Sequence, residues 1–130
     1  MSDTDPDPGP LPEFRVDIDR QGNDILVAVR GDVDVYTAPQ LRERLYAVLT
    51  DGAARVVLDV SKMTFIDSTG LGVIVGTLKR LREQGGDLIL AGPSRSALNV
   101  LEITGLSRII ETVETVEPAG GGTGGPGEDR

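Results

Sequence analysis

The fold is decided by the stretch from Val56 to Leu81, which reads VVLDVSKMTFIDSTGLGVIVGTLKRL. Its first five residues form a short, nearly continuous apolar run, which is typical of an interior strand covered on both faces. Further along, apolar side chains recur at helical spacing and predict a helix from about Thr69 to Glu83, which the glycines at 85 and 86 end. A strand, a short polar loop and a helix in this order indicate an α/β protein.

Upstream of this stretch the pattern predicts a β-hairpin and a helix. Apolar and polar residues alternate over 14–19, a turn follows at 21–24, and 25–29 has the pattern of a second strand. Thr37 can cap the helix, which would end at Gly52. The helix would bury one apolar face, made of Leu41, Leu45, Val48 and Leu49.

Downstream of the stretch the pattern predicts three more elements. They are a strand over 88–91, a helix from 94 or 95 to Thr104 that Gly105 closes, and a last strand over 109–113. Strands that alternate with helices favour a sheet that is parallel in its later part. We therefore expect a single α/β domain with a mixed sheet, antiparallel in its first hairpin and largely parallel afterwards, with helices packed against it.

The ends of the chain differ in composition from its body. Residues 1–12 are rich in proline and aspartate and residues 118–130 are rich in glycine. Neither segment can bury enough apolar surface to offset the entropy of ordering, so we expect disordered tails there and one domain over 13–117. At about 105 residues, such a domain buries enough surface to fold without disulfides or metals.

Composition excludes several functions. The chain has no His and no Cys, so it lacks an imidazole base, a thiolate nucleophile and the usual zinc ligands. Its formal charge of −8 argues against nucleic-acid binding, which needs an excess of Lys and Arg. No apolar run approaches the roughly 20 residues of a membrane helix and no leader follows Met1, so we expect a cytoplasmic protein without a membrane contact.

The loop Asp67-Ser68-Thr69-Gly70 lies at the end of the sheet where α/β proteins place their working groups. Any of its first three residues could simply cap the helix by accepting a bond from a backbone N–H. Ser68 lacks the flanking glycine pattern of a hydrolase nucleophile and has no histidine base, and the loop lacks the lysine of a P-loop. A serine at a helix start can instead be phosphorylated, which adds about −1.5 to −2 charges.

The predicted helix after this loop has an unusual outer face. Its core stripe consists of Leu71, Ile74, Val75, Leu78 and Leu81. The opposite side carries Thr69, Gly72, Val73, Gly76 and Arg80. Each glycine costs a helix roughly 1 kcal/mol relative to alanine, so a smooth strip of this kind predicts a surface that another macromolecule approaches closely. The alternatives are that the two glycines are merely tolerated or that another loop lies over them.

Three stretches of the chain resemble the STAS-domain anti-anti-sigma factors, which are bacterial antagonists of anti-sigma serine kinases. Residues 31–39, Gly-Asp-Val-Asp-Val-Tyr-Thr-Ala-Pro, resemble the family's entry into its first helix, with Asp32 where Glu is usual. Most of 57–73 resembles the family's strand and phosphoacceptor loop, and parts of 85–106 resemble its later strand and helix. The resemblance covers nearly the whole body and implies a single STAS-type domain.

The resemblance also implies a function. In the family the serine after the Asp is phosphorylated by the kinase, which places the phosphoacceptor at Ser68, with Thr69 as the neighbour most easily confused with it. The unphosphorylated protein binds the anti-sigma kinase and displaces its sigma factor, phosphorylation breaks that contact, and a separate serine phosphatase restores it. The protein would be a substrate and a binder, not an enzyme, so the kinase would bring ATP, Mg²⁺ and the proton acceptor, and the chain no cofactor or metal.

The partner surface is expected to combine residues from the motifs with those of the helix face. Asp34 matches a family Asp that lies near the acceptor and contributes to partner binding. With the loop and the smooth strip, the expected partner-binding residues are Asp34, Asp67, Thr69, Gly70, Gly72, Val73 and Gly76.

Two other functions stay open at this point. The domain could dock into a larger regulatory or transport complex without being phosphorylated, in which case Ser68 is only part of a helix cap. The loop after Asp67 could bind a nucleotide, which the missing lysine and histidine disfavour. Transfer of phosphate from a kinase to Ser68 would indicate a phosphorylated antagonist. A lack of transfer would indicate the docking domain.

Overall fold

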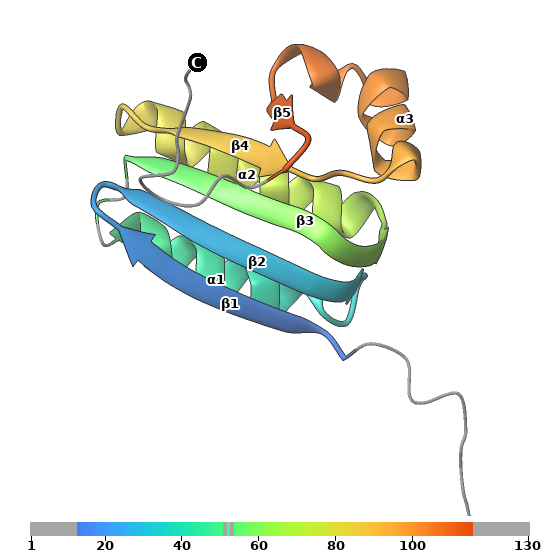
Figure 1. Ribbon diagram of the computed structural model, residues 1–130, viewed down its shortest axis with the longest axis horizontal. Helices are drawn as coiled ribbons and strands as arrows, with labels where there is room; N and C mark the ends of the chain where they lie inside the picture. Colours follow the sequence, from blue (N-terminus) through green and yellow to red (C-terminus); the bar gives the residue numbers. More distant parts are fainter. Residues whose placement is uncertain (1–12, 51, 53, 116–130) are drawn as a thin grey trace, which may run out of the picture.

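Five strands form one sheet, in the order in which they occur along the chain. They are β1 (Arg15–Gln21), β2 (Asp24–Val33), β3 (Arg55–Ile66), β4 (Asp87–Ala91) and β5 (Glu111–Val113). The pair β1 and β2 is antiparallel and every later pair of neighbours is parallel, which confirms the predicted fold class. The computed structural model (Figure 1) describes residues 13–50, 52 and 54–115, and the tails predicted at 1–12 and 118–130 lie outside these residues.

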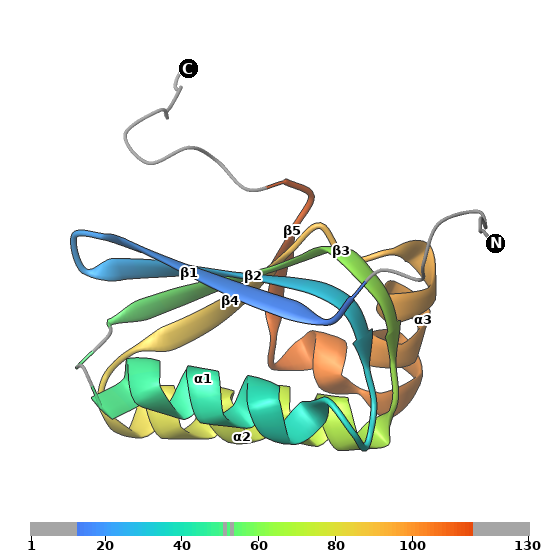
Figure 2. The same cartoon turned by 90° about the horizontal axis from the view of Figure 1, so that it is seen from below.

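Two long helices cover one face of the sheet. They are α1 (Ala38–Thr50) and α2 (Ser68–Glu83), which run side by side. Figure 2 shows the opposite face of the sheet without a helix in the described part of the chain. A third helix, α3 (Arg95–Thr104), and the 3₁₀ helix η1 (Leu106–Arg108) lie beside the end of β4 and next to β5. Both long helices therefore pack on the same face of the sheet.

This one-sided cover corrects the prediction for β3. Its residues Val56, Leu58 and Val60 face the helices and are buried, whereas Val57 and Asp59 between them are only half-buried. The prediction that both faces of this strand are covered is therefore wrong. The strand is interior in another sense, because β2 and β4 flank it within the sheet.

The end of β3 bends toward the helix layer. The strand continues past Val60 to Ile66, further than predicted, and its pairing with β2 shifts register twice opposite residues 28–32. Extra residues of this kind form β-bulges, which bend a strand and increase its twist. In Figure 2 the ends of β2 and β3 curl toward the helices and deliver the chain to the starts of α1 and α2. The polar residues Ser61, Lys62 and Thr64 interrupt the apolar run and conceal this extension in the sequence.

The C-terminal part of the domain follows the prediction except at its end. The helix α3 ends at Thr104, and Gly105 follows it with a positive φ of 81°. The strand predicted over 109–113 is shorter, because η1 precedes it and β5 begins only at Glu111. Ile110 is buried in the core, so the apolar character just before β5 reflects packing rather than strand pairing.

The core lies between the helix-facing side of the sheet and the inner faces of α1 and α2. All four apolar residues predicted for the inner face of α1 are buried. In α2 the predicted stripe buries Ile74, Leu78 and Leu81. Thr77 is buried as well, which the apolar pattern does not predict, and its hydroxyl donates to the carbonyl oxygen of Val73 at 2.8 Å. The polar side chain is thus satisfied within its own helix.

The first turn of α2 lies very close to the ends of β2 and β3. Gly70 is buried, and a Cβ at this position would lie 2.6 Å from Cγ1 of Val33 and 2.8 Å from Cγ1 of Ile66. Carbon atoms prefer separations of about 3.5–4.0 Å, so any larger residue would displace a side chain of the core. Close packing therefore explains why residue 70 is glycine.

We expect Gly70→Ala to destabilise the domain by about 1–3 kcal/mol, the usual cost of overpacking a core. The matched control is Gly72→Ala, because a Cβ at residue 72 meets no atom within 4 Å, and alanine favours a helix by up to about 1 kcal/mol over glycine. Chemical denaturation of both variants measures the two changes in the free energy of unfolding. A Gly70→Ala variant as stable as the wild type would contradict the close approach of α2.

Candidate functional site

Two loops lie side by side at the carboxyl ends of β2 and β3. One loop, residues 34–37, leads from β2 into α1, and the other, at Asp67, leads from β3 into α2. The backbone N–H of Asp67 donates to the carbonyl oxygen of Val33 at 3.1 Å and joins the two loops. Because the carboxyl ends of parallel strands commonly carry the working groups of an α/β sheet, we place the candidate functional site here.

Asp67 caps α2. Its backbone is extended, and its Oδ1 accepts from the N–H of Thr69 at 2.9 Å and from the N–H of Gly70 at 3.1 Å. These are two of the four N–H groups that a helix start leaves without a partner. The capping role that the sequence allowed for three neighbouring residues therefore belongs to Asp67.

Ser68 is the first residue of α2, and its side chain is exposed. Among the residues that the structure describes, the Ser68 hydroxyl has no hydrogen-bond partner, and the same holds for the exposed hydroxyl of Thr69. Since Asp67 already caps the helix, neither hydroxyl is needed to hold the loop. Both are free to react with or bind another molecule.

Asp34 organises the neighbouring loop. Its Oδ1 accepts from the N–H of Tyr36 at 2.9 Å and from the N–H of Thr37 at 3.1 Å. The hydrogen bond from the Thr37 backbone, supported by that from Tyr36 and partly offset by desolvation, holds the pKa of Asp34 below its usual 3.8. The carboxylate is therefore bound to its own loop, where it fixes the backbone beside Asp67.

Thr37 immediately precedes α1, as predicted, but its hydroxyl does not cap that helix. The Oγ1 atom donates to the carbonyl oxygen of Asp32 at 2.7 Å and accepts from the N–H of Asp34 at 2.9 Å. The predicted side-chain cap is thus corrected, because the hydroxyl is used inside the loop that Asp34 organises.

Three exposed apolar side chains lie in or next to the two loops and form what we term the loop patch. Val35 and Tyr36 in the first loop are 57% and 83% exposed, and Phe65 at the end of β3 is 52% exposed. Large apolar groups exposed near one another are a common sign of a protein contact. No periodic pattern marks them in the sequence. A signal was present nonetheless, since two of the chain's only four aromatic residues stand beside these loops.

The outer face of α2 is open at one predicted glycine and covered at the other. Gly72 is exposed and has open space where a Cβ would lie. Gly76 is half-buried, because the hydroxyl of Tyr46 from α1 lies 3.4 Å from the position of its missing Cβ. Val73 is half-buried as well and packs against the core. The predicted strip is therefore exposed at Thr69, Gly72 and Arg80, whereas a side chain from a helix, and not a loop, lies over Gly76.

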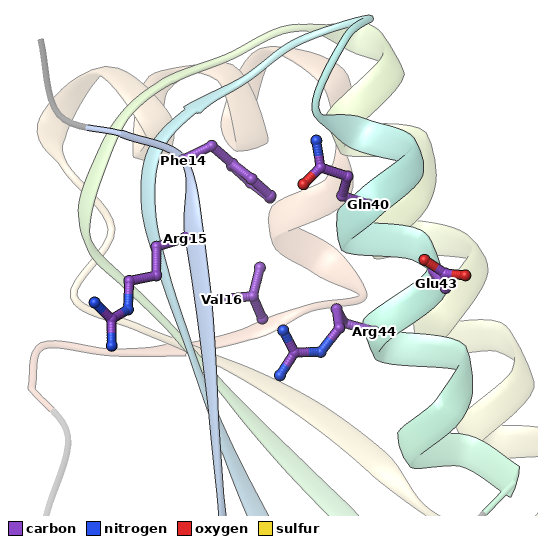
Figure 3. A pocket seen from close by; sticks show the side chains of 6 residues that line it. All are labelled: Phe14, Arg15, Val16, Gln40, Glu43 and Arg44. Atoms are coloured by element: carbon purple, nitrogen blue, oxygen red, sulfur yellow. The ribbon is translucent and has the colours of Figure 1, made fainter.

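A concave surface lies elsewhere, between β1 and α1, on the side of the domain away from α2. Figure 3 shows this groove of about 300 Å³, which is lined by Phe14, Arg15, Val16, Gln40, Glu43 and Arg44. Its polar side chains are exposed and of mixed charge, and Arg15 points away from the groove. Ligand pockets usually hold a few convergent polar groups in an apolar lining, which this groove lacks. The loops remain the better candidate.

The candidate site offers hydroxyls, carboxylates and apolar side chains. In the part of the chain that the structure describes, no three His, Cys, Asp or Glu side chains are placed to hold a metal ion. No helix in that part is long and apolar enough to cross a membrane. What the two loops present to a second molecule is therefore a pair of free hydroxyls next to the loop patch.

Comparison with known sequences assigns the chain to a family. The STAS domain profile matches residues 15–119, and the chain belongs to the STAS-domain family. It is 47% identical over 100 residues to the anti-sigma-B factor antagonist of Bacillus subtilis, an alignment that covers 75% of this chain and 89% of that protein. Within the STAS-domain family, it belongs with the anti-sigma factor antagonists.

Solved structures share the fold. An anti-sigma factor antagonist from Mycobacterium paratuberculosis superposes with a TM-score of 0.73 at 24% identity, covering 80% of this chain and 88% of that chain. The Bacillus protein SpoIIAA in its phosphorylated form superposes with a TM-score of 0.62 at 22% identity, covering 77% and 90%. At these identities the likeness establishes the arrangement of strands and helices and nothing more.

We expect Asp67→Ala to lower the stability of the domain by about 1 kcal/mol, because two helix N–H groups lose their acceptor. This change corresponds to a fall of roughly 4–8 °C in melting temperature for a domain of this size. Asp67→Asn is the matched control, since asparagine keeps a side-chain oxygen and caps about as well. Thermal unfolding followed by circular dichroism measures both. Equal losses in the two variants would show that the charge, and not the cap, matters.

Proposed function

We propose that this protein is an anti-sigma factor antagonist that is switched off by phosphorylation of Ser68. In this scheme the unphosphorylated form binds an anti-sigma serine kinase, which then releases its sigma factor. The observation that carries the proposal is an exposed Ser68 hydroxyl without a hydrogen-bond partner in the described residues. It stands directly after the Asp67 cap, in a chain 47% identical to an anti-sigma-B factor antagonist.

The partner would catalyse the phosphoryl transfer. The Ser68 Oγ attacks the γ-phosphorus of ATP bound to the kinase, the bond to the β-phosphate oxygen breaks, and ADP leaves. The hydroxyl proton passes to a base of the kinase. Because the chain contains no histidine or cysteine, we assign Ser68 the role of a substrate, and the kinase brings ATP, Mg²⁺ and the base.

A phosphate on Ser68 would find few donors in its own helix. Helix N-termini attract anions through their free N–H groups, but Asp67 already accepts from the N–H groups of Thr69 and Gly70. The phosphate adds about −1.5 to −2 charges beside this carboxylate, with Asp34 in the adjoining loop. We therefore expect the phosphate to project outward, where its bulk, charge and desolvation cost oppose the partner. The switch would be local, and the fold would persist.

The kinase would cover the loop patch and the exposed start of α2. The loop patch supplies apolar contact area, and Thr69 and Gly72 form a low, exposed surface that a partner can approach closely. The other residues expected at the partner surface would act mainly by fixing the shape of the two loops and of the outer face of α2. They are Asp34, Asp67, Gly70, Val73 and Gly76.

Two further participants belong to the proposal. A serine phosphatase would hydrolyse the phosphate and restore the binding form. The cycle would take place in the cytoplasm, where sigma factors meet RNA polymerase. If Ser68 were never phosphorylated, the domain would instead be a docking module within a larger complex, which the following experiment distinguishes.

Incubation with the purified cognate anti-sigma kinase and Mg-ATP should place one phosphate on Ser68, as mapped by mass spectrometry. Ser68→Ala should abolish the label and keep kinase affinity, and Ser68→Asp should weaken affinity at least about tenfold, because a charge then enters the contact. Thr69→Ala is the control and should still be labelled. A wild-type chain that binds the kinase without acquiring phosphate would favour the docking module. A labelled Ser68→Ala variant would show that another residue accepts the phosphate and would overturn the assignment to Ser68.

Gly72→Arg should weaken kinase binding strongly and leave the melting temperature nearly unchanged. The space around residue 72 is open, so an arginine fits the isolated domain but obstructs a partner. Gly72→Ala is the control and should bind normally. Calorimetric titration and thermal unfolding provide the two measurements. A large loss of stability with intact binding would show that this glycine serves the fold and lies outside the contact.

A further inference from the structure

An arginine–tyrosine–arginine cluster joins α1 and α2 on their outer side. The guanidinium carbon of Arg42 lies 5.0 Å from the ring centroid of Tyr46, and that of Arg80 lies 4.7 Å from the same centroid. Arg42 and Tyr46 belong to α1, and Arg80 belongs to α2. Both arginines are exposed and the tyrosine is half-buried against the core. We call these three residues the Arg–Tyr–Arg cluster.

The two arginines of the cluster have no acidic partner among the described residues. The ion pairs recorded there use Arg15, Arg55 and Arg82, and neither Arg42 nor Arg80 takes part in one. This is unexpected in a chain with 21 acidic and 13 basic side chains. Stacking on a ring leaves the N–H groups at the edge of a guanidinium free to bind a carboxylate with two parallel hydrogen bonds.

Both arginines affect the pKa of Tyr46. The neighbouring guanidinium group of Arg42, with a smaller effect from Arg80, holds the pKa of the Tyr46 hydroxyl below its usual 10.0, and partial burial of the hydroxyl opposes this shift. The hydroxyl also lies 3.4 Å from the position of the missing Cβ of Gly76. Two cations therefore flank a tyrosine whose hydroxyl lies over Gly76, where α2 carries no side chain.

The cluster is continuous with the surface around Ser68. Ser68, Gly72, Gly76 and Arg80 follow one another at intervals of four residues, which form a ridge that winds along a helix. At 1.5 Å per residue, Arg80 lies about 18 Å from Ser68 along the axis of α2. A protein seated over Ser68 and Gly72 can therefore reach the cluster, which lies too far away for a phosphate on Ser68 to neutralise it.

We propose that the Arg–Tyr–Arg cluster is a second contact for the anti-sigma kinase and binds an aspartate or glutamate side chain of that protein. The proposal rests on the proposed function, because it extends the same partner surface. Charge complementarity favours a carboxylate here, because the two exposed arginines have no acidic partner among the described residues. The acidity of the whole chain, whose net charge is −8 with both arginines counted, opposes a polyanion such as nucleic acid but admits a single carboxylate.

A contact at the Arg–Tyr–Arg cluster, far from Ser68, would hold the kinase whether or not Ser68 is phosphorylated. The kinase must hold the unphosphorylated protein long enough to modify it, while the contact at Ser68 is the one that phosphorylation breaks. A carboxylate held at the cluster would contribute affinity in both states. Its loss should therefore raise KM for this protein as a kinase substrate and leave kcat nearly unchanged.

The test compares Arg42→Gln and Arg80→Gln with Lys79→Gln in the full chain. Lys79 is an exposed cation next to Arg80 on α2 and makes no contact with Tyr46, so it controls for the loss of one positive charge. Calorimetric titration with the purified cognate anti-sigma kinase should show each arginine variant binding about tenfold more weakly, the usual effect of losing a charge-assisted hydrogen bond. The lysine variant should stay within about twofold, since exposed charges contribute little.

Added salt should weaken the wild type more than Arg80→Gln, because the missing contact is electrostatic. The variant Arg80→Lys keeps the positive charge but loses the planar edge of N–H donors. Its affinity for the kinase should lie between those of the wild type and Arg80→Gln. Thermal unfolding of every variant shows whether the cluster only braces the two helices. A lower melting temperature with unchanged affinity and KM would overturn the proposal in favour of that bracing role.

The two proposals fail in different ways. Normal binding and Ser68 labelling of both arginine variants would overturn the cluster contact alone. Equal weakening by Lys79→Gln would also overturn it, because a general charge effect would then explain the result. A wild-type chain that neither binds the kinase nor becomes phosphorylated would overturn the proposed function, and the cluster contact with it.

Discussion

The missing Cβ at residue 70 is the constraint on which the candidate site depends. A carbon there would lie 2.6 Å from Val33 and 2.8 Å from Ile66, so only glycine lets the first turn of α2 settle against the ends of β2 and β3. That contact sets the direction in which α2 leaves the sheet and thereby positions Ser68 two residues earlier. The bulges of β3 contribute to the same result, because they bend the strand toward the helix layer before α2 begins.

The polar residues around Ser68 divide into those that hold the loops and those that stay free. Asp67 accepts two helix N–H groups, and Asp34 accepts two from its own loop. The Ser68 hydroxyl has no such task in the described part of the chain. Under the proposed function this division suits a reversible modification, because Ser68 can gain and lose a phosphate without breaking a hydrogen bond that the fold uses. The binding surface changes while the domain beneath it stays folded.

The side-by-side packing of α1 and α2 creates surfaces that neither helix has alone. Tyr46 extends from α1 to cover Gly76 of α2, and it is contacted by an arginine from each helix. This packing places a helix–helix contact at Gly76, within the predicted smooth strip, and leaves the part near Ser68 open. It also gathers positive charge at one place on an acidic protein, since the chain as a whole carries a net charge of −8.

The sequence by itself determined the order of the elements, the hairpin, the end of α3 at Gly105 and the motif around Ser68. Apolar spacing and turn residues depend on neighbours within a few positions, so a single chain displays them. Only the tertiary structure decided that β3 is covered by helices on one face, that Asp67 is the cap, that Gly72 is open while Gly76 is covered, and that the loop patch flanks the site. Those features depend on the three-dimensional path of the chain. Tyr46 and Val33 reach α2 from elements far away in the sequence, and no local pattern records which distant side chain fills the space beside a glycine.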